Sequence, residues 1–232
     1  MLQRLAIDRG AILYDPRPVA EPGAQLFDPQ FWRARGALSE LPGGRGSILL
    51  IEDAGRSWVL RRYLRGGFAA RFARDRYLWL GEEHTRSFQE LRLLAALHAR
   101  GLPVPPPVAG RYVRSALTYR AELITERLIG ARSLEAVLEA GPMDGARWTA
   151  IGRCLRRFHD AGVQHADLNS RNIMLGEQGE VWVLDFDRGR LRAPGTWSER
   201  SLDRLARSLE NAENDLGDWH GGFELLRRAH DG

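Results

Sequence analysis

The sequence contains no lysine, so all 34 of its basic residues are arginine. Any phosphate-binding role that lysine often takes must therefore fall to arginine, whose planar guanidinium binds anions as a fork and not as a point charge. Cysteine is almost absent too. Because Cys154 is the only one, no internal disulfide can form, and a reducing, cytoplasmic compartment is expected.

Long hydrophobic runs are also missing. Apolar stretches such as residues 47–51 are far shorter than the roughly 18 to 20 residues that a membrane-spanning helix needs. The first residues have too little apolar length for a secretory signal. A net charge of +4 suits an anionic ligand or surface, but it does not choose among a nucleotide, a nucleic acid and a phospholipid headgroup.

The N-terminal region is rich in turn-forming residues. Residues 1–40 carry several Pro, Gly and Arg residues and predict an N-terminal arm with one short helix near 28–36. We expect the aromatic side chains of this arm to pack on the body of the protein, since scattered aromatic residues usually serve packing. They are Phe27, Phe31 and Trp32.

A glycine-rich segment precedes two predicted strands. The strands cover 47–51 and 57–63 and are joined by a turn at 53–55. The preceding residues let the backbone approach a ligand closely, although a simple turn is the alternative reading. They include Gly43, Gly44, Gly46 and Ser47.

The helix predicted from Ser87 carries a carboxylate on its leucine-rich face. Glu90 shares that face with leucines, and a carboxylate in such a position is costly unless it is paired. An arginine of the preceding strand is the obvious partner. Side chains alternate along a strand, so Arg61 and Arg62 point to opposite faces, and the sequence leaves both open.

The densest group of chemically useful residues lies between His165 and Asp187. Asp167 and Asn172 belong to the loop H-x-D-L-x-x-x-N, and Asp185 follows an apolar strand-like run. Two carboxylates and an amide form a set of oxygen ligands suitable for magnesium, beside a possible general base. We expect His165 to be a structural residue and not an acid or base.

These segments occur in the order found in the protein-kinase-like phosphotransferases, which the chain resembles. The resemblance implies an α+β, two-lobed protein-kinase-like fold with a small β-rich N-lobe and a short helical C-lobe. It implies one domain, composed of an N-terminal arm (1–40), an N-lobe (41–125) and a C-lobe (126–232).

Within that fold the chain is most similar to the lipopolysaccharide core kinases, in particular the Kdo kinases, over about residues 43–207. This resemblance implies ATP-dependent phosphorylation of a hydroxyl on the Kdo (3-deoxy-D-manno-octulosonic acid) residue attached to lipid A precursor, with Mg²⁺. It also implies a peripheral position on the cytoplasmic face of the bacterial inner membrane, with its anionic surface as partner. No nucleic acid and no obligate protein partner are expected. The segments that carry the resemblance are 60–63, 65–67, 85–90, 101–105, 162–169 and 185–187.

The resemblance also implies roles for individual residues. Asp167 would accept or orient the acceptor's hydroxyl proton, Asn172 and Asp185 would hold magnesium, and the segment from Gly43 to Ser47 would cover the phosphates. Arg61, paired to Glu90, would contact the phosphates in place of the usual lysine, with Arg62 as the rival. Main-chain groups in the segment that contains Glu126 and Leu128 would meet the adenine.

Two departures from protein kinases favour a sugar acceptor. Position 166 is Ala where regulated kinases often have Arg, and no Ala-Pro-Glu segment follows Asp185. Arginines at 65, 71, 74, 76, 188, 190 and 192 could bind anionic groups of the acceptor, or could simply be solvated. The alternatives are a heptose kinase, another small-molecule kinase of the aminoglycoside phosphotransferase type, a pseudokinase acting as a binding module, and a nucleic-acid binder.

Overall fold

The computed structural model describes residues 1–40, 48–64, 75–193, 195–212, 214 and 216–232. The chain divides into two compact units: an N-terminal unit of residues 1–96 and 106–127, and a C-terminal unit of residues 97–105 and 128–232. An antiparallel sheet dominates the first and helices dominate the second, which confirms the predicted α+β class. No helix within the described ranges is both long and apolar enough to cross a bilayer.

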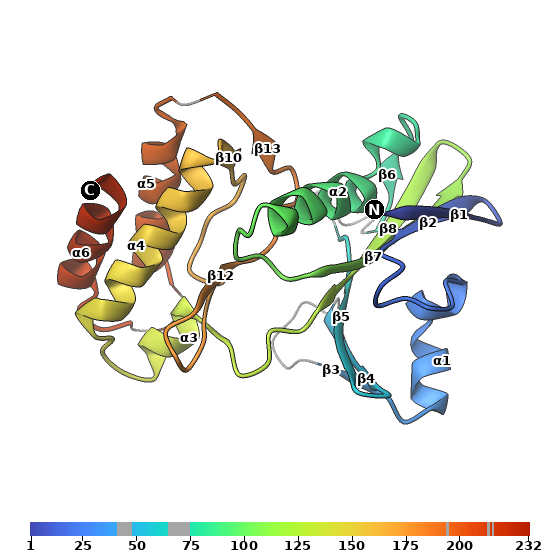
Figure 1. Cartoon of the computed structure of the whole chain (residues 1–232), viewed down its shortest axis with the longest axis horizontal. Helices are drawn as coiled ribbons and strands as arrows, with labels where there is room; N and C mark the ends of the chain where they lie inside the picture. Colours follow the sequence, from blue (N-terminus) through green and yellow to red (C-terminus); the bar gives the residue numbers. More distant parts are fainter. Residues whose placement is uncertain (41–47, 65–74, 194, 213, 215) are drawn as a thin grey trace. The chain divides into compact units, whose positions relative to one another are not determined.

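Eight antiparallel strands form the sheet of the N-terminal unit. Their order is β1-β2-β7-β8-β5-β4-β3, with β6 paired to β8 (Figure 1). The strands are β1 (Gln3–Ile7), β2 (Gly10–Tyr14), β3 (Leu38–Glu40), β4 (Ile48–Asp53), β5 (Arg56–Arg62), β6 (Tyr77–Leu78), β7 (Pro107–Ser115) and β8 (Thr118–Glu126).

The N-terminal residues, expected to form an arm docked on the body, instead supply two strands of this sheet. β2 pairs with β7 from Gly10↔Val113 to Tyr14↔Ala109, and β1 pairs along its other edge. Residues 11–13 are buried as a result. The pairing joins segments far apart in the sequence, so the local content of proline and glycine does not reveal it.

The short helix predicted near 28–36 is present as α1 (Pro29–Ala34), which follows the single turn η1 (Ala24–Phe27). Asp28 caps α1 by accepting a hydrogen bond from the main-chain N–H of Gln30. Phe27 and Trp32 are fully or almost fully buried in the same core as Trp58 of β5. The prediction that these two aromatic residues serve packing is confirmed.

The predicted hairpin is β4 and β5, closed by a two-residue loop between Asp53 and Arg56. Ala54 and Gly55 have φ values of 49° and 78°, the left-handed conformation that such tight hairpin loops require. Glycine adopts it without steric cost.

Helix α2 (Arg86–Ala99) lies along the sheet (Figure 1). The Ser87 hydroxyl donates to the carbonyl oxygen of Arg111 in β7, and Phe88 packs edge-on against Tyr112. The short turn η3 (Glu82–His84) precedes α2. The leucine face of α2 is thereby directed at the sheet, and Glu90 comes with it.

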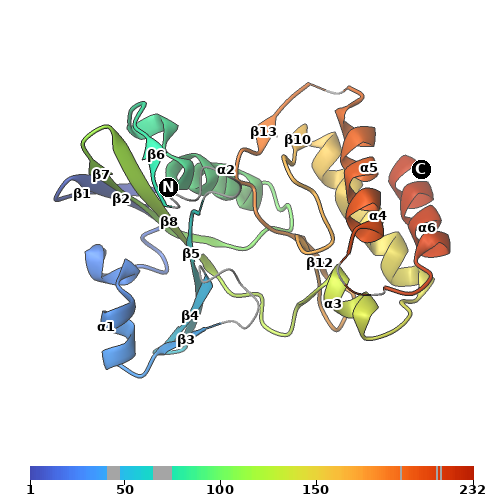
Figure 2. The ribbon, with the colours of Figure 1, turned by 180° about the vertical axis from the view of Figure 1, so that it is seen from behind.

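Within its described residues the C-terminal unit consists of four helices and two small sheets, and Figure 2 shows its helices from behind. The strand orders are β12-β11-β9 and β10-β13. The helices are α3 (Leu134–Glu139), α4 (Gly145–Asp160), α5 (Trp197–Glu210) and α6 (His220–Asp231). The strands are β9 (Arg132–Ser133), β10 (Val163–Gln164), β11 (Ile173–Leu175), β12 (Val181–Val183) and β13 (Arg190–Leu191).

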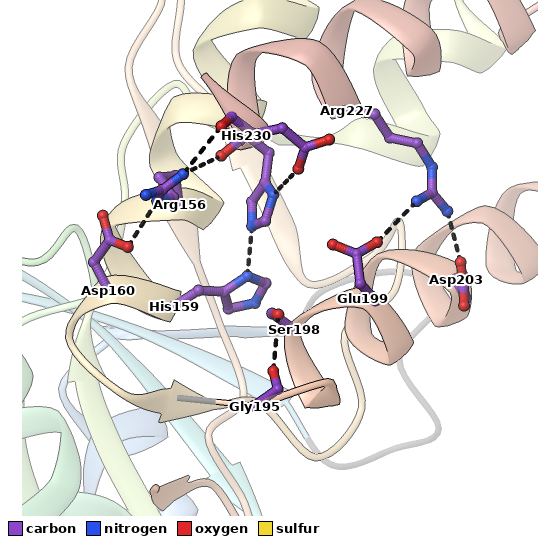
Figure 3. Close-up of polar contacts among 10 residues, drawn as sticks. Arg156, His159, Asp160, Gly195, Ser198, Glu199, Asp203, Arg227 and His230 are labelled. Carbon is purple, nitrogen blue, oxygen red and sulfur yellow. Dashed lines mark hydrogen bonds and ion pairs between the residues drawn. The ribbon is translucent and has the colours of Figure 1, made fainter. Parts of the chain in front are cut away.

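A buried histidine pair joins α4 to α6 (Figure 3). His159 Nδ1 and His230 Nε2 lie 2.7 Å apart, and His230 Nδ1 lies 3.0 Å from Asp231 Oδ1. When His230 donates to Asp231, its Nε2 accepts from His159, so both rings can be neutral. The helices approach closely at Gly152, where a Cβ would lie 2.2 Å from the Leu226 carbonyl oxygen.

Candidate active site

The loop from His165 to Asn172 is fixed by hydrogen bonds that start at His165. His165 Nε2 lies 2.7 Å from the Leu184 carbonyl oxygen, and its Nδ1 accepts from the main-chain N–H of Asp167. The ring is 6 % exposed and packs edge-on against Phe186. Burial lowers the pKa of His165, which favours the neutral ring that these two bonds require. This geometry supports a structural role.

Asp167 presents its carboxylate to solvent at the start of this loop. Its side chain is 70 % exposed, and Arg204 Nη1 of α5 lies 3.6 Å from Oδ1. Asn169 Nδ2 lies 3.1 Å from the Asp167 carbonyl oxygen and 3.3 Å from Oδ2. An exposed carboxylate on a fixed backbone can accept a proton from an incoming hydroxyl group.

The side chain of Asn172 is oriented by a hydrogen bond to the main chain of Asp167. Its Nδ2 donates to the Asp167 carbonyl oxygen at 2.9 Å, which leaves Oδ1 as the atom able to bind a cation. The Leu184 N–H donates to the Asn172 carbonyl oxygen at 2.8 Å, so the strand pairing sets Asn172 opposite the residue before Asp185. Asn172 and Asp185 therefore come from neighbouring segments of one small sheet.

Asp185 has a left-handed backbone, with φ of 60°. This conformation costs a non-glycine residue about 1–2 kcal/mol, and such outliers cluster at functional sites. The next residue, Phe186, is buried and stacks on Phe158 at 5.6 Å, which anchors the turn. A carboxylate and an oriented amide oxygen from paired segments are the kinds of oxygen ligand that Mg²⁺ prefers.

In the N-terminal unit, Glu90 is paired as the sequence required. Its carboxylate accepts from Arg61 Nη2 and from the Tyr63 hydroxyl, both at 2.5 Å, while its side chain is 2 % exposed. Arg62 points to the other face and lies 3.2 Å from Glu122, which also binds Arg111. The structure thus shows the Arg61–Glu90 ion pair.

The other predicted nucleotide-binding residues stand as follows. Gly43, Gly44, Gly46 and Ser47 lie outside the described residues. Glu126 ends β8, where its N–H donates to the Pro106 carbonyl oxygen at 2.9 Å. Leu128 follows in the C-terminal unit, and its carbonyl oxygen accepts from Ala131 at 3.3 Å.

Comparison with known proteins shows the family of the chain. The family model described as "Lipopolysaccharide kinase (Kdo/WaaP) family" matches residues 29–223. The chain belongs to the lipopolysaccharide kinase (Kdo/WaaP) family.

Similar curated proteins are named 3-deoxy-D-manno-octulosonic acid kinase. That of Stenotrophomonas maltophilia (strain R551-3) is 47 % identical over 226 residues, covering 96 % of this chain and 90 % of the relative. That of Xylella fastidiosa (strain 9a5c) has the same identity and coverage. That of Xanthomonas axonopodis pv. citri (strain 306) is 47 % identical over 227 residues, covering 93 % and 90 %. The predicted family resemblance is confirmed.

Four residues that contact the predicted site residues or their loop were not predicted from the sequence. Tyr63 contacts Glu90, and Arg204 and Asn169 contact Asp167. Glu135 is buried and accepts from the Ser170 hydroxyl at 2.6 Å and from Arg171 Nε at 2.8 Å. Alternation along the strand predicted over 57–63 places Tyr63 on the face of Arg61, and this signal could have identified it. The contact of Asn169 is local, two residues along the loop, whereas those of Arg204 and Glu135 depend on tertiary packing.

A second group of potential metal ligands is formed by Glu199, His230 and Asp231 (Figure 3). Two arginines lie near these groups: Arg227 is 3.3 Å from Glu199, and Arg156 donates to the main-chain carbonyl oxygen of His230 at 2.9 Å. Two guanidinium groups repel a cation. We therefore interpret the group as a set of polar contacts that joins α4, α5 and α6, and not as a metal site.

Proposed function

We propose that this member of the lipopolysaccharide kinase family transfers the γ-phosphoryl group of ATP to a hydroxyl of the Kdo residue attached to lipid A precursor. The observation that carries the proposal is the fixed loop and strand unit of Asp167, Asn172 and Asp185. Relatives that are almost half identical over nearly the whole chain are named for this acceptor. The division of the chain into an N-lobe (41–125) and a C-lobe (126–232) is part of the proposal.

In the proposed reaction the acceptor oxygen forms a bond to the γ-phosphorus while the bond to the bridging oxygen of ADP breaks. The hydroxyl proton passes to the carboxylate of Asp167. The main chain of this residue is fixed by the hydrogen bond from its N–H to His165 Nδ1. Asn172 Oδ1 and the Asp185 carboxylate would hold Mg²⁺, which when bound neutralises charge on the phosphates. The whole set is present in this chain, which favours an active enzyme over a pseudokinase.

On the nucleotide side, Arg61 would bind phosphate oxygens while Glu90 and Tyr63 hold its guanidinium in place. A guanidinium can make two parallel hydrogen bonds to a phosphate, so arginine can replace the usual lysine. Backbone groups of residues 43–47 would cover the phosphates, and main-chain groups at Glu126 and Leu128 would bind the adenine.

A peripheral membrane position also belongs to the proposal. Leu78, Leu80 and Leu117 are 66 %, 72 % and 77 % exposed, and the Trp79 N–H donates to the Leu117 carbonyl oxygen, which brings these leucines together. The same part of the sheet has a hollow lined by arginines. Exposed leucines beside arginines suit an anionic lipid surface. These arginines are Arg9, Arg76, Arg114 and Arg120.

The decisive experiment incubates the purified chain with labelled ATP and Mg²⁺, using Kdo-bearing lipid A precursor or heptosylated core as acceptor. Label is expected on the Kdo-bearing lipid. Label only on the heptosylated core would make the chain a heptose kinase, and label on neither would contradict sugar phosphorylation. Cosedimentation with anionic vesicles tests the membrane surface, where Leu117→Asp is expected to weaken binding.

A further inference from the structure

A cavity of about 340 Å³ opens beside the catalytic loop, within the C-terminal unit. His165 and Ala166 form one side, and the first two turns of α5 form another. Three arginines line it, and none of the described residues that line it is acidic. They are Arg192, Arg200 and Arg204.

Two of these arginines have no carboxylate partner among the described residues. Arg192 and Arg200 are exposed and take part in no ion pair there, in contrast to Arg156 and Arg227 of the same unit. Arg200 is nevertheless positioned, because its Nη2 donates to Thr196 Oγ1 at 2.7 Å. An arginine held by its own helix can receive an anion with little loss of side-chain entropy.

The segment that carries Arg192 is fixed by a close backbone approach. The Arg192 N–H donates to the Gly162 carbonyl oxygen at 2.7 Å, next to the pairing of β10 with β13. Gly162 has φ of 73°, and a Cβ there would lie 2.5 Å from the Arg192 carbonyl oxygen. Glycine at 162 is thus what allows this approach.

The third arginine links the cavity to the proposed base. Arg204 lies 3.6 Å from Asp167 Oδ1, so a ligand in the cavity would lie next to the carboxylate that accepts the hydroxyl proton. A group bound there belongs to the molecule that is being phosphorylated. The N-terminal end of α5 adds partial positive charge along one wall.

We propose that this cavity binds the carboxylate of the sugar-acid acceptor, with Arg192 and Arg200 as its ligands. The inference rests on the proposed function, in which the acceptor is a sugar acid. The carboxylate and the ring hydroxyls of such a sugar lie close together, and a cavity of this volume, lined by Ala166 and Arg204 next to Asp167, can contain both. Lipid A phosphates are also anionic, but they lie on other sugars, farther from the reacting hydroxyl.

The test compares Arg200→Gln with Arg153→Gln, a control that removes an exposed arginine of α4. Loss of one charged hydrogen-bonding partner is expected to lower kcat/KM for the Kdo-bearing lipid by roughly 10- to 100-fold in Arg200→Gln. KM for ATP should not change, and Arg153→Gln should behave as wild type. Equal effects of the two substitutions would overturn the proposal.

Modified acceptors identify the anionic group. With an acceptor whose Kdo carboxyl is reduced to an alcohol, wild type should fall to the level of Arg200→Gln, and the substitution should have no further effect. If Arg200→Gln still lowers kcat/KM on this reduced acceptor, the assignment of the cavity to the carboxylate is refuted. A loss that instead disappears on dephosphorylated lipid A would assign the cavity to a phosphate and also refute it.

Binding of free Kdo, followed by NMR titration, separates this inference from the proposed function. If wild type binds Kdo more tightly than Arg200→Gln but transfers no phosphate, the function fails and the cavity assignment stands. If transfer occurs but Arg200→Gln changes neither binding nor kcat/KM, the function stands and the assignment fails. Equal thermal unfolding of the two variants ensures that the comparison concerns folded protein.

Discussion

Replacing Glu90 by glutamine should weaken both the fold and the use of ATP. The substitution keeps the shape of the side chain but removes the charge that Arg61 and Tyr63 share. The Glu90 side chain is 2 % exposed and that of Arg61 is 23 % exposed. Arg61 would therefore lose its counter-charge in a site where water replaces it only in part.

The size of the effect follows from this burial. Breaking a fully buried ion pair costs about 3–5 kcal/mol, and a hydrogen bond to a charged group contributes about 1.5–3 kcal/mol. Because Arg61 keeps some contact with water, a loss of roughly 2–3 kcal/mol in the free energy of unfolding is expected. At roughly 2–4 °C per kcal/mol for a chain of this size, the melting temperature should fall by about 5–10 °C.

Catalysis needs a separate measurement, because a less stable protein can still be fully active below its melting temperature. With Arg61 held less firmly, kcat/KM for ATP at 20 °C should fall by about tenfold or more, equivalent to about 1.4 kcal/mol of transition-state stabilisation. KM for the acceptor should change little. Calorimetry and steady-state kinetics give the two numbers independently.

Glu122→Gln is the matched control. Glu122 lies on the neighbouring strand, its side chain is 11 % exposed, and it binds Arg62 and Arg111. Its loss should lower the melting temperature while leaving kcat/KM for ATP near the wild-type value. If both substitutions reduce kcat/KM for ATP equally, the reasoning that singles out the Arg61–Glu90 pair is wrong.

Three further predictions concern single residues. Asp167→Ala should abolish phosphate transfer but leave ATP binding largely intact by calorimetric titration, and full activity would rule out the proton-accepting role. Arg61→Ala should raise KM for ATP more than Arg62→Ala does, and the reverse order would move the phosphate contact to Arg62. Burial, aided by the nearby His230, lowers the pKa of His159 from 6.5 to about 4, so between these values the unfolded chain binds more protons. The free energy of unfolding should therefore fall by up to roughly 3 kcal/mol as the pH drops through this window. In His159→Phe, the free energy of unfolding measured by urea denaturation should depend less on pH, and an unchanged pH dependence would contradict the assignment.

Local patterns in the sequence predicted the parts of the site that lie close together along the chain. The loop from His165 to Asn172 and the turn at Asp185 are set by short-range bonds, such as that between His165 and the Asp167 N–H. The hairpin of β4 and β5 follows from alternation and from a turn that requires left-handed residues. The position of Glu90 on a leucine face was enough to require an arginine partner, because a buried carboxylate without one is too costly.

Only the tertiary structure decided which distant residues meet. The choice between Arg61 and Arg62 depends on which face of β5 lies toward Glu90 of α2. Alternation along one strand does not show which face that is. The place of β2 beside β7 depends on pairing between remote segments. Arg200 lines the same cavity as His165 and Ala166 because α5 packs beside their loop. The physical reason is common to all three: periodicity defines the two faces of an element, whereas contacts between elements depend on how those faces are buried against one another.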